Sequence, residues 1–137
     1  MQTAMIIFVS ACVLSIWALY RREDRARRAN LNALKDRNFN PKYILIGASH
    51  YVAFDTDSKQ LAFASRKSAQ LFLFTEMAEI RWSWFEKGGR KENNDLHFRL
   101  NNVNCPLVKV RCTSSRQAEE WQAKIQAMWF EFNGQVI

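Results

Sequence analysis

The residues of this chain that could do chemistry are its three cysteines and two histidines. A structural zinc site needs cysteine and histidine ligands in closely spaced pairs. Cys105 and Cys112 are seven positions apart and His97 lies eight positions before Cys105, so the spacing does not favour a metal. A nucleophile that pairs Cys112 with His97 or His50 is compatible with the spacing, but neither cysteine lies in a nucleophile motif. We therefore expect no catalytic residue, no metal, no cofactor and no enzyme.

Motifs for binding phosphate are also missing. There is no Walker A loop and no Gly-rich dinucleotide loop, and Gly88-Gly89 fits a hairpin turn instead. The chain carries 20 Lys and Arg against 13 Asp and Glu, a net charge of +7, which favours a membrane surface or a nucleic acid as partner. The basic pairs Arg66-Lys67 and Arg90-Lys91 fall in or beside predicted turns, whereas the aromatic residues follow a core-facing alternation. We therefore expect solvated turns rather than a nucleic-acid groove.

An apolar stretch occupies the first twenty residues, which contain no charged side chain. As a helix, residues 1–20 span about 30 Å, the thickness of the hydrocarbon core of a bilayer. Trp17 and Tyr20 stand at its C-terminal end, where membrane proteins carry aromatic belts. The alternatives are a buried core helix, a cleaved signal peptide and a lipoprotein signal at Cys12, but signals place basic residues before the apolar run and here they follow it. We predict a transmembrane helix over residues 1–20.

Five arginines follow this stretch directly: Arg21, Arg22, Arg25, Arg27 and Arg28. By the positive-inside rule they hold this flank in the cytoplasm and place the N-terminus outside. They also lie within the distance over which an anionic membrane surface attracts charge, so we predict that all five contact anionic lipid. Free thiols in the remaining chain fit the reducing cytoplasm.

Residues 21–41 are predicted to form a basic helical linker, supported by the i,i+4 pairs Glu23/Arg27 and Asp24/Arg28 and ended before Pro41. From residue 42 the apolar period changes to two, which is typical of strands. Turn residues separate the alternating runs. The predicted strands cover residues 43–47, 50–55, 60–65, 70–74, 78–86, 95–100 and 107–112.

The last predicted element is an amphipathic helix that starts after Ser114, which is spaced with Gln117 as a capping box. Its apolar stripe consists of Ala118, Trp121, Ile125, Met128, Trp129 and Phe132. Asn133-Gly134 is typical of a helix end, so the predicted domain covers residues 42–133 and leaves 134–137 as a tail. We expect Trp121 and Ile125, together with Trp82 of the strand over 78–86, to anchor the fold.

Short strands followed by one closing helix, whose residues 118–125 read AEEWQAKI, resemble the pleckstrin-homology-like fold. The resemblance implies an α+β domain in which a seven-stranded antiparallel barrel or sandwich is closed by the C-terminal helix. The phosphoinositide site of that family needs basic residues in the stretch that corresponds to residues 47–51. Here that stretch reads GASHY and holds no Lys or Arg, so we expect neither that site nor another small-molecule substrate.

The predicted transmembrane helix, the arginines that follow it and the predicted domain together indicate a single-pass protein of a bacterial inner membrane. Its cytoplasmic domain is predicted to be an interaction module. Such a module would act as an adaptor or scaffold that recruits a protein partner, through an exposed sheet face or a sheet edge. The alternative is a membrane-tethered domain that binds nucleic acid or has an enzymatic activity. A defined membrane complex would favour the first hypothesis, and salt-dependent retention of nucleic acid would favour the second.

Overall fold

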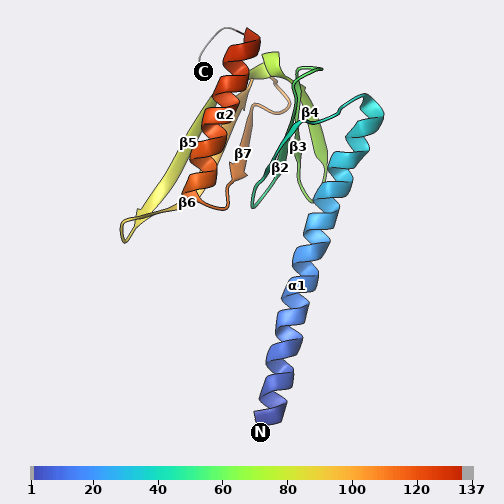
Figure 1. The fold of residues 1–137 in the computed structure, drawn as a ribbon, viewed down its shortest axis with the longest axis vertical. Helices are drawn as coiled ribbons and strands as arrows, with labels where there is room; N and C mark the ends of the chain where they lie inside the picture. The colour runs from blue at the N-terminus through green and yellow to red at the C-terminus, as the bar shows by residue number, and fades with distance from the viewer. Residues whose placement is uncertain (1, 134–137) are drawn as a thin grey trace.

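A computed structural model describes residues 2–133, an α+β chain in which two helices flank seven strands (Figure 1). The two long helices are α1 (Gln2–Ala33) and α2 (Ser115–Asn133), and two short 3-10 helices are η1 (Leu34–Arg37) and η2 (Phe74–Glu76). The strands are β1 (Tyr43–Ile46), β2 (Tyr51–Asp55), β3 (Gln60–Ala64), β4 (Ala69–Leu73), β5 (Met77–Lys87), β6 (Arg90–Leu100) and β7 (Leu107–Arg111). The predicted tail, residues 134–137, lies outside the described residues.

All the predicted strands are present, and six of them begin and end within one residue of the predicted bounds. The exception is β6, which begins at Arg90 rather than at residue 95. Residues 90–94 have no apolar alternation, but Lys91 and Glu92 pair with β5 as the second arm of a long hairpin. The hairpin turns at Gly88-Gly89, both at positive φ as predicted for a two-residue turn.

The strands form two antiparallel sheets, of order β1-β2-β3-β4 and β5-β6-β7. Of the two predicted forms, a barrel or a sandwich, the barrel is therefore wrong, because the two sheets do not close on each other. Between β4 and β5 the chain forms the short helix η2, and the two strands do not pair with each other. On the other side, the contact between β1 and β7 is made by the turn after β1, where the N–H of Ala48 donates to the carbonyl of Arg111 at 2.7 Å. Alternation identifies strands in a sequence, but it does not say whether the two end strands pair.

The main core lies between the two sheets and α2. Ile125 is fully buried there, as predicted for an anchor of the fold. Trp121 is only partly buried and stacks on Phe54, with ring centroids 6.1 Å apart. Trp82 is also partly buried, and its indole N–H donates to Oδ1 of Asn94 at 3.1 Å. The two tryptophans therefore cover the rim of the core rather than its centre.

A second apolar cluster lies on the outer face of the four-stranded sheet, against the C-terminal half of α1 (Figure 1). Its buried members are Leu31, Leu34, Phe39, Tyr51, Ala53, Ala62 and Ala64. Because β2 and β3 are covered on both faces, α1 completes the domain instead of leading to it. The predicted division between a linker over 21–41 and a domain from residue 42 needs correction, since Leu31, Leu34 and Phe39 are part of the packed unit.

Candidate functional site

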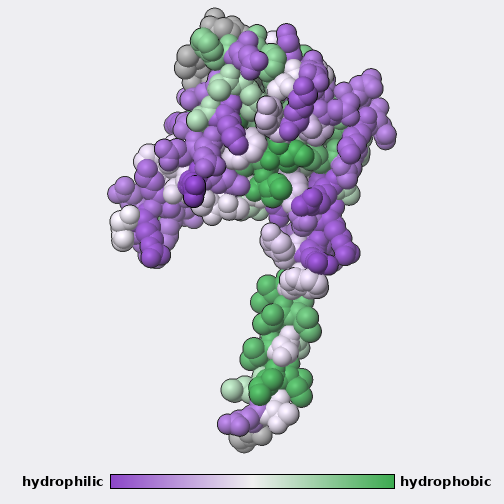
Figure 2. All heavy atoms as spheres, viewed as in Figure 1, coloured by the Kyte–Doolittle hydropathy of each residue, from purple (hydrophilic) through white to green (hydrophobic). Residues whose placement is uncertain are grey.

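The N-terminal half of α1 is the one helical segment among residues 2–133 that is long and apolar enough to cross a membrane. No part of its apolar window is buried against the rest of the chain (0%). Figure 2 shows it as an apolar rod that projects from the polar surface of the domain. A helix that is apolar on all sides is unfavourable in water and requires another covering.

Arg27, just beyond the apolar half of α1, binds this helix to the domain. Its side chain is buried, and Nη1 donates to the carbonyls of Gly47 at 3.2 Å and Ala48 at 3.0 Å, in the turn between β1 and β2. The guanidinium lies 5.3 Å from the centroid of the Tyr51 ring, and Nη2 lies 3.8 Å from a carboxylate oxygen of Glu23. Hydrogen bonds from a charged donor are stronger than neutral ones, so Arg27 fixes the position of α1 over the sheet.

The turn between β3 and β4 is held by the same helix. Nδ2 of Asn30 donates to the carbonyls of Ser65 at 2.8 Å and Arg66 at 3.2 Å. Arg66 in turn lies 3.4 Å from Glu23 of α1. Residues 21–41 were predicted as a basic helical linker, and that prediction did not include these contacts. The signal that could have found them is the small apolar residues Ala53 and Ala62 on the outer face of the sheet.

The arginines predicted to contact lipid do not share one environment. Those with exposed side chains are Arg21, Arg22, Arg25 and Arg28. The predicted pair of Arg28 with Asp24 is present at 3.0 Å, and the guanidinium of Arg21 lies over the ring of Trp17 at 4.1 Å. Arg27 is bound to the domain and 7% exposed, so it is not free to contact lipid and the prediction is corrected for that residue.

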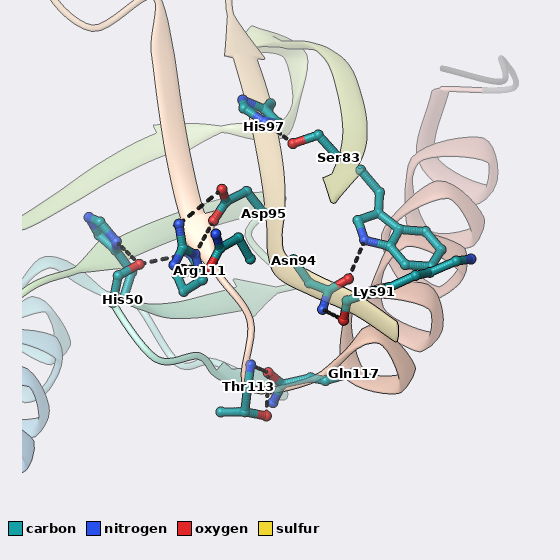
Figure 3. Close-up of polar contacts among 12 residues, drawn as sticks. His50, Ser83, Lys91, Asn94, Asp95, His97, Arg111, Thr113 and Gln117 are labelled. Atoms are coloured by element: carbon teal, nitrogen blue, oxygen red, sulfur yellow. Dashed lines mark hydrogen bonds and ion pairs between the residues drawn. The ribbon is translucent and has the colours of Figure 1, made fainter. Parts of the chain in front are cut away.

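A polar network joins the two sheets at the end of the domain where Arg27 binds (Figure 3). Ser49 Oγ accepts a hydrogen bond from the N–H of Arg111 at 2.8 Å and lies 2.8 Å from Nδ1 of His50. The Arg111 guanidinium forms a two-point pair with Asp95. Burial, and then the charge of Arg27, lower the pKa of His50. Because Asp95 is engaged by Arg111, it does not orient a histidine as a catalytic base.

His97 lies on the three-stranded sheet, where its Nε2 is 2.7 Å from Oγ of Ser83 (Figure 3). Burial, followed by the charges of Arg81 and Lys109, lowers the pKa of His97 against the opposing effect of Asp95. A neutral imidazole that is hydrogen-bonded to a neighbouring hydroxyl fits a structural contact between β5 and β6.

The sulfhydryl of Cys112 is buried, which raises its pKa to about 11. A thiol with that pKa is protonated at neutral pH and is a poor nucleophile. Among residues 2–133 no group of three or more His, Cys, Asp or Glu side chains is placed to hold a metal ion. The hydrogen-bond partners of His50 and His97 are Ser49 and Ser83, respectively.

A shallow hollow of about 790 Å³ separates the β5–β6 hairpin from the start of α2. It is lined by residues 89–94 and 111–115. Oγ of Ser114 accepts from the N–H of Gln117 at 3.1 Å, which is one half of the predicted capping box. The other half differs, because the Gln117 side chain accepts from Thr113 rather than from Ser114 (Figure 3). The same side chain donates to the carbonyl of Ile46 at 3.0 Å. These contacts occupy the polar groups at the start of α2.

No family model, curated protein or solved structure matches this chain.

Proposed function

We propose that this chain is a single-pass membrane protein that holds its α+β domain against the cytoplasmic face of a bacterial inner membrane, where the domain acts as an interaction module. The observation that carries the proposal is the exposure of the whole apolar half of α1, in a helix that continues without a break into the domain. A core helix of a soluble protein is mostly buried, and this one is not. A bilayer is the covering that matches its length.

The orientation rests on the exposed arginines. Arg21, Arg22 and Arg25 follow the apolar run within one and a half helical turns, and flanks rich in arginine stay in the cytoplasm. The domain, which begins within the same helix, then lies on the cytoplasmic side. This places Cys105 and Cys112 in a reducing compartment, where both stay free thiols.

The interaction role is supported by the edge strand β1. Tyr43, Ile44 and Ile46 are exposed there, between α1 on one side and α2 on the other, where Figure 2 shows an apolar patch. An edge strand with exposed apolar side chains is a place where a partner can add a strand. The order of four strands, then three, then a helix supports the resemblance to the pleckstrin-homology-like fold. We take that fold as part of the proposal, and function does not follow from it.

The alternative of a tethered nucleic-acid-binding domain gains less support. Arg66 and Lys67 lie in the β3–β4 connection, whereas Lys87, Arg90 and Lys91 lie in the strand ends of the β5–β6 hairpin. The two groups belong to different sheets and do not follow one groove lined by aromatic rings. The enzymatic alternative gains no support from Cys112, since burial raises the pKa of its thiol.

Membrane insertion is tested by alkaline extraction of cell membranes that contain the full chain. We expect the chain to stay in the membrane pellet, and the double variant Ile7→Arg/Leu14→Arg to move to the supernatant, because each central arginine costs about 2.5–3.5 kcal/mol of insertion. The matched control is Ala29→Arg, at an exposed position of the same helix beyond the apolar half. Equal extraction of all three proteins would contradict a spanning helix.

The partner surface is tested by a photo-crosslinking residue at Ile44, with Leu107 as control. Both are exposed apolar residues on edge strands, β1 and β7. We expect a discrete crosslinked protein at Ile44 that is absent at Leu107. The same products at both positions, or none, would argue against β1 as the binding edge.

A further inference from the structure

The hairpin formed by β5 and β6 projects from the domain beside α1 (Figure 1). We propose that its tip, residues 84–91, is a membrane contact that lies on anionic lipid head groups beside the transmembrane helix. This inference rests on the proposed span of α1, and it adds a lipid-binding site within the domain where the sequence predicted none.

The direction of the hairpin follows from the fold. Because the strands of the four-stranded sheet run antiparallel, the β1–β2 and β3–β4 connections lie at one end of it. Arg111, which pairs with Asp95 at the base of the β5–β6 hairpin, is hydrogen-bonded to Ala48 and Ser49 of the β1–β2 connection, so the base of the hairpin lies at that end too. Arg27 and Asn30 bind the β1–β2 and β3–β4 connections, so α1 enters the domain at that same end. Figure 1 shows the hairpin tip projecting on the side toward which the apolar half of α1 extends.

The distance to the bilayer is short. Arg27 follows Tyr20, the last residue of the apolar run, by seven residues in one continuous α-helix. At 1.5 Å per residue this places the bound turn about 10 Å from the end of the apolar run. That is about one Debye length at physiological salt, so charges at this end of the domain act on the lipid surface.

The hairpin reaches further than the rest of this end. β7 pairs with residues 95–99 of β6, and just beyond it Asn93 and Asn94 accept hydrogen bonds from Arg111 and from the N–H of Cys112. Nearer the tip, residues 85–87 of β5 pair with residues 90–92 of β6. From Ser83, the partner of Asp95, to Lys87 at the tip, four residues extend about 13 Å at 3.3–3.4 Å per residue. A two-stranded ribbon of this kind is marginally stable by itself in water.

An irregularity at the base of the ribbon fixes its direction. The register shifts between Ser83 and Phe85, and opposite them Asn93 adopts a positive φ of 52°. Asn94 is buried there, accepts from the indole of Trp82 and donates to the carbonyl of Lys91 (Figure 3). Bulges of this kind bend a strand pair, and the buried amide holds the bend in place.

The composition of the tip suits a lipid interface. Trp84 and Phe85 are 43% and 60% exposed, which is unusual for adjacent aromatic residues on a water-facing ribbon. Nζ of Lys91 lies 4.4 Å from the Trp84 ring, and Lys87 and Arg90 flank the turn. Aromatic rings with basic neighbours are typical of the membrane–water interface.

The turn itself can approach a flat surface. The space beside Gly88 and Gly89 is open, since a side chain at either position would meet no atom within 4 Å. The hollow that residues 89–94 share with the start of α2 is shallow, and Ser114 and Gln117 on its α2 side are hydrogen-bonded to each other. The contact therefore depends on charge and aromatic surface, and selects anionic lipid without choosing among head groups.

The test places an environment-sensitive fluorophore on the full chain in nanodiscs of phosphatidylcholine and phosphatidylglycerol. The label is attached through Lys87→Cys at the tip or, as control, through Val103→Cys, which is 97% exposed in the β6–β7 connection at the opposite end of the domain. Cys12 and Cys105 are replaced by Ser. Cys112 can stay, because its thiol is buried and its raised pKa of about 11 keeps it unreactive.

We expect a blue shift of the emission at position 87 in these nanodiscs, and none at position 103. The double variant Trp84→Ser/Phe85→Ser should abolish the shift, whereas the matched change Leu107→Ser, at another exposed apolar strand residue, should leave it unchanged. No shift at position 87, a shift that survives loss of both aromatic rings, or a shift that appears only when a protein extract is added would overturn the proposal.

A third label, at native Cys12, separates this inference from the proposed span. Cys12 lies in the middle of the apolar half of α1, so its label reports the bilayer core if the helix crosses it. A polar environment at Cys12 refutes the span itself. An apolar environment at Cys12 together with a polar one at position 87 refutes the hairpin contact alone.

Discussion

Replacement of Phe39 by Ala tests whether the segment after α1 belongs to the folded domain. Asn38 takes a left-handed conformation at the end of η1, which turns the chain back over the sheet. Phe39 is then fully buried in the second cluster, and the next N–H, that of Asn40, donates to Oδ2 of Asp55 at 2.9 Å. The Phe39→Ala variant loses the burial of a whole aromatic ring and leaves a cavity between α1 and the sheet.

The expected cost is about 3–5 kcal/mol in the free energy of unfolding. At about 4–8 °C per kcal/mol, the melting temperature should fall by at least about 12 °C. The assay is thermal unfolding of the full chain in detergent, followed by near-ultraviolet circular dichroism of the domain.

The control is Arg37→Ala, at an exposed position two residues earlier, which should change stability by less than about 0.5 kcal/mol. A fragment that starts at residue 42 lacks Phe39, Leu34 and Leu31 and should not fold cooperatively, whereas one that starts at residue 21 should. If Phe39→Ala melts within about 3 °C of the natural chain, or if the shorter fragment folds normally, α1 does not complete the domain.

Three further predictions concern α2, the thiols and the topology. Ile125→Ala should destabilise the domain by about 2–5 kcal/mol, and Trp121→Ala by no more than about 3 kcal/mol because the Trp121 ring is partly exposed. Denaturant titrations measure both changes, and a larger loss for Trp121→Ala would contradict the partial burial of its ring. Cys112 should react with a thiol reagent at neutral pH far more slowly than Cys105, and equal rates would show that it is accessible. Folding raises the pKa of the Cys112 thiol from 9.0 to about 11. The contribution of the buried, protonated thiol to stability is therefore complete below pH 9 and is lost as the pH rises toward 11. Unfolding measured as a function of pH tests this. A fluorescent reporter that matures only in the cytoplasm should be active when it is fused after residue 137, and an active alkaline phosphatase at that position would reverse the orientation.

The strands and the closing helix could be predicted because their patterns are local. Ile80 and Trp82 alternate with polar neighbours along β5, and Ile125 and Trp129 share one helical stripe in α2. The start of β6 could not be predicted, because residues 90–94 are all polar and form a strand only by pairing with β5. An extended hairpin depends on its partner strand, which local periodicity does not identify.

The docking of α1 was missed for a different physical reason. Charged residues such as Arg27 and Glu23 in a helix are normally solvated, and the carbonyl groups that bind Arg27 belong to a turn twenty residues away. Only the tertiary fold brings them together. Ala62 and Ala53 did carry a signal, since strands that are apolar on both faces are covered on both sides, but alternation was sought for one face alone.

The unbroken helix between span and domain also sets a rotational phase. An α-helix turns by about 100° per residue, so the direction in which the domain faces around the axis of the span depends on the number of residues between the apolar run and Arg27. One residue inserted there would swing β1 and the β5–β6 hairpin about a quarter turn around that axis, and insertion of a seven-residue block would nearly restore them. The side of the span on which a neighbouring membrane protein packs therefore determines which surface of the domain that neighbour meets. No flexible segment averages the orientation.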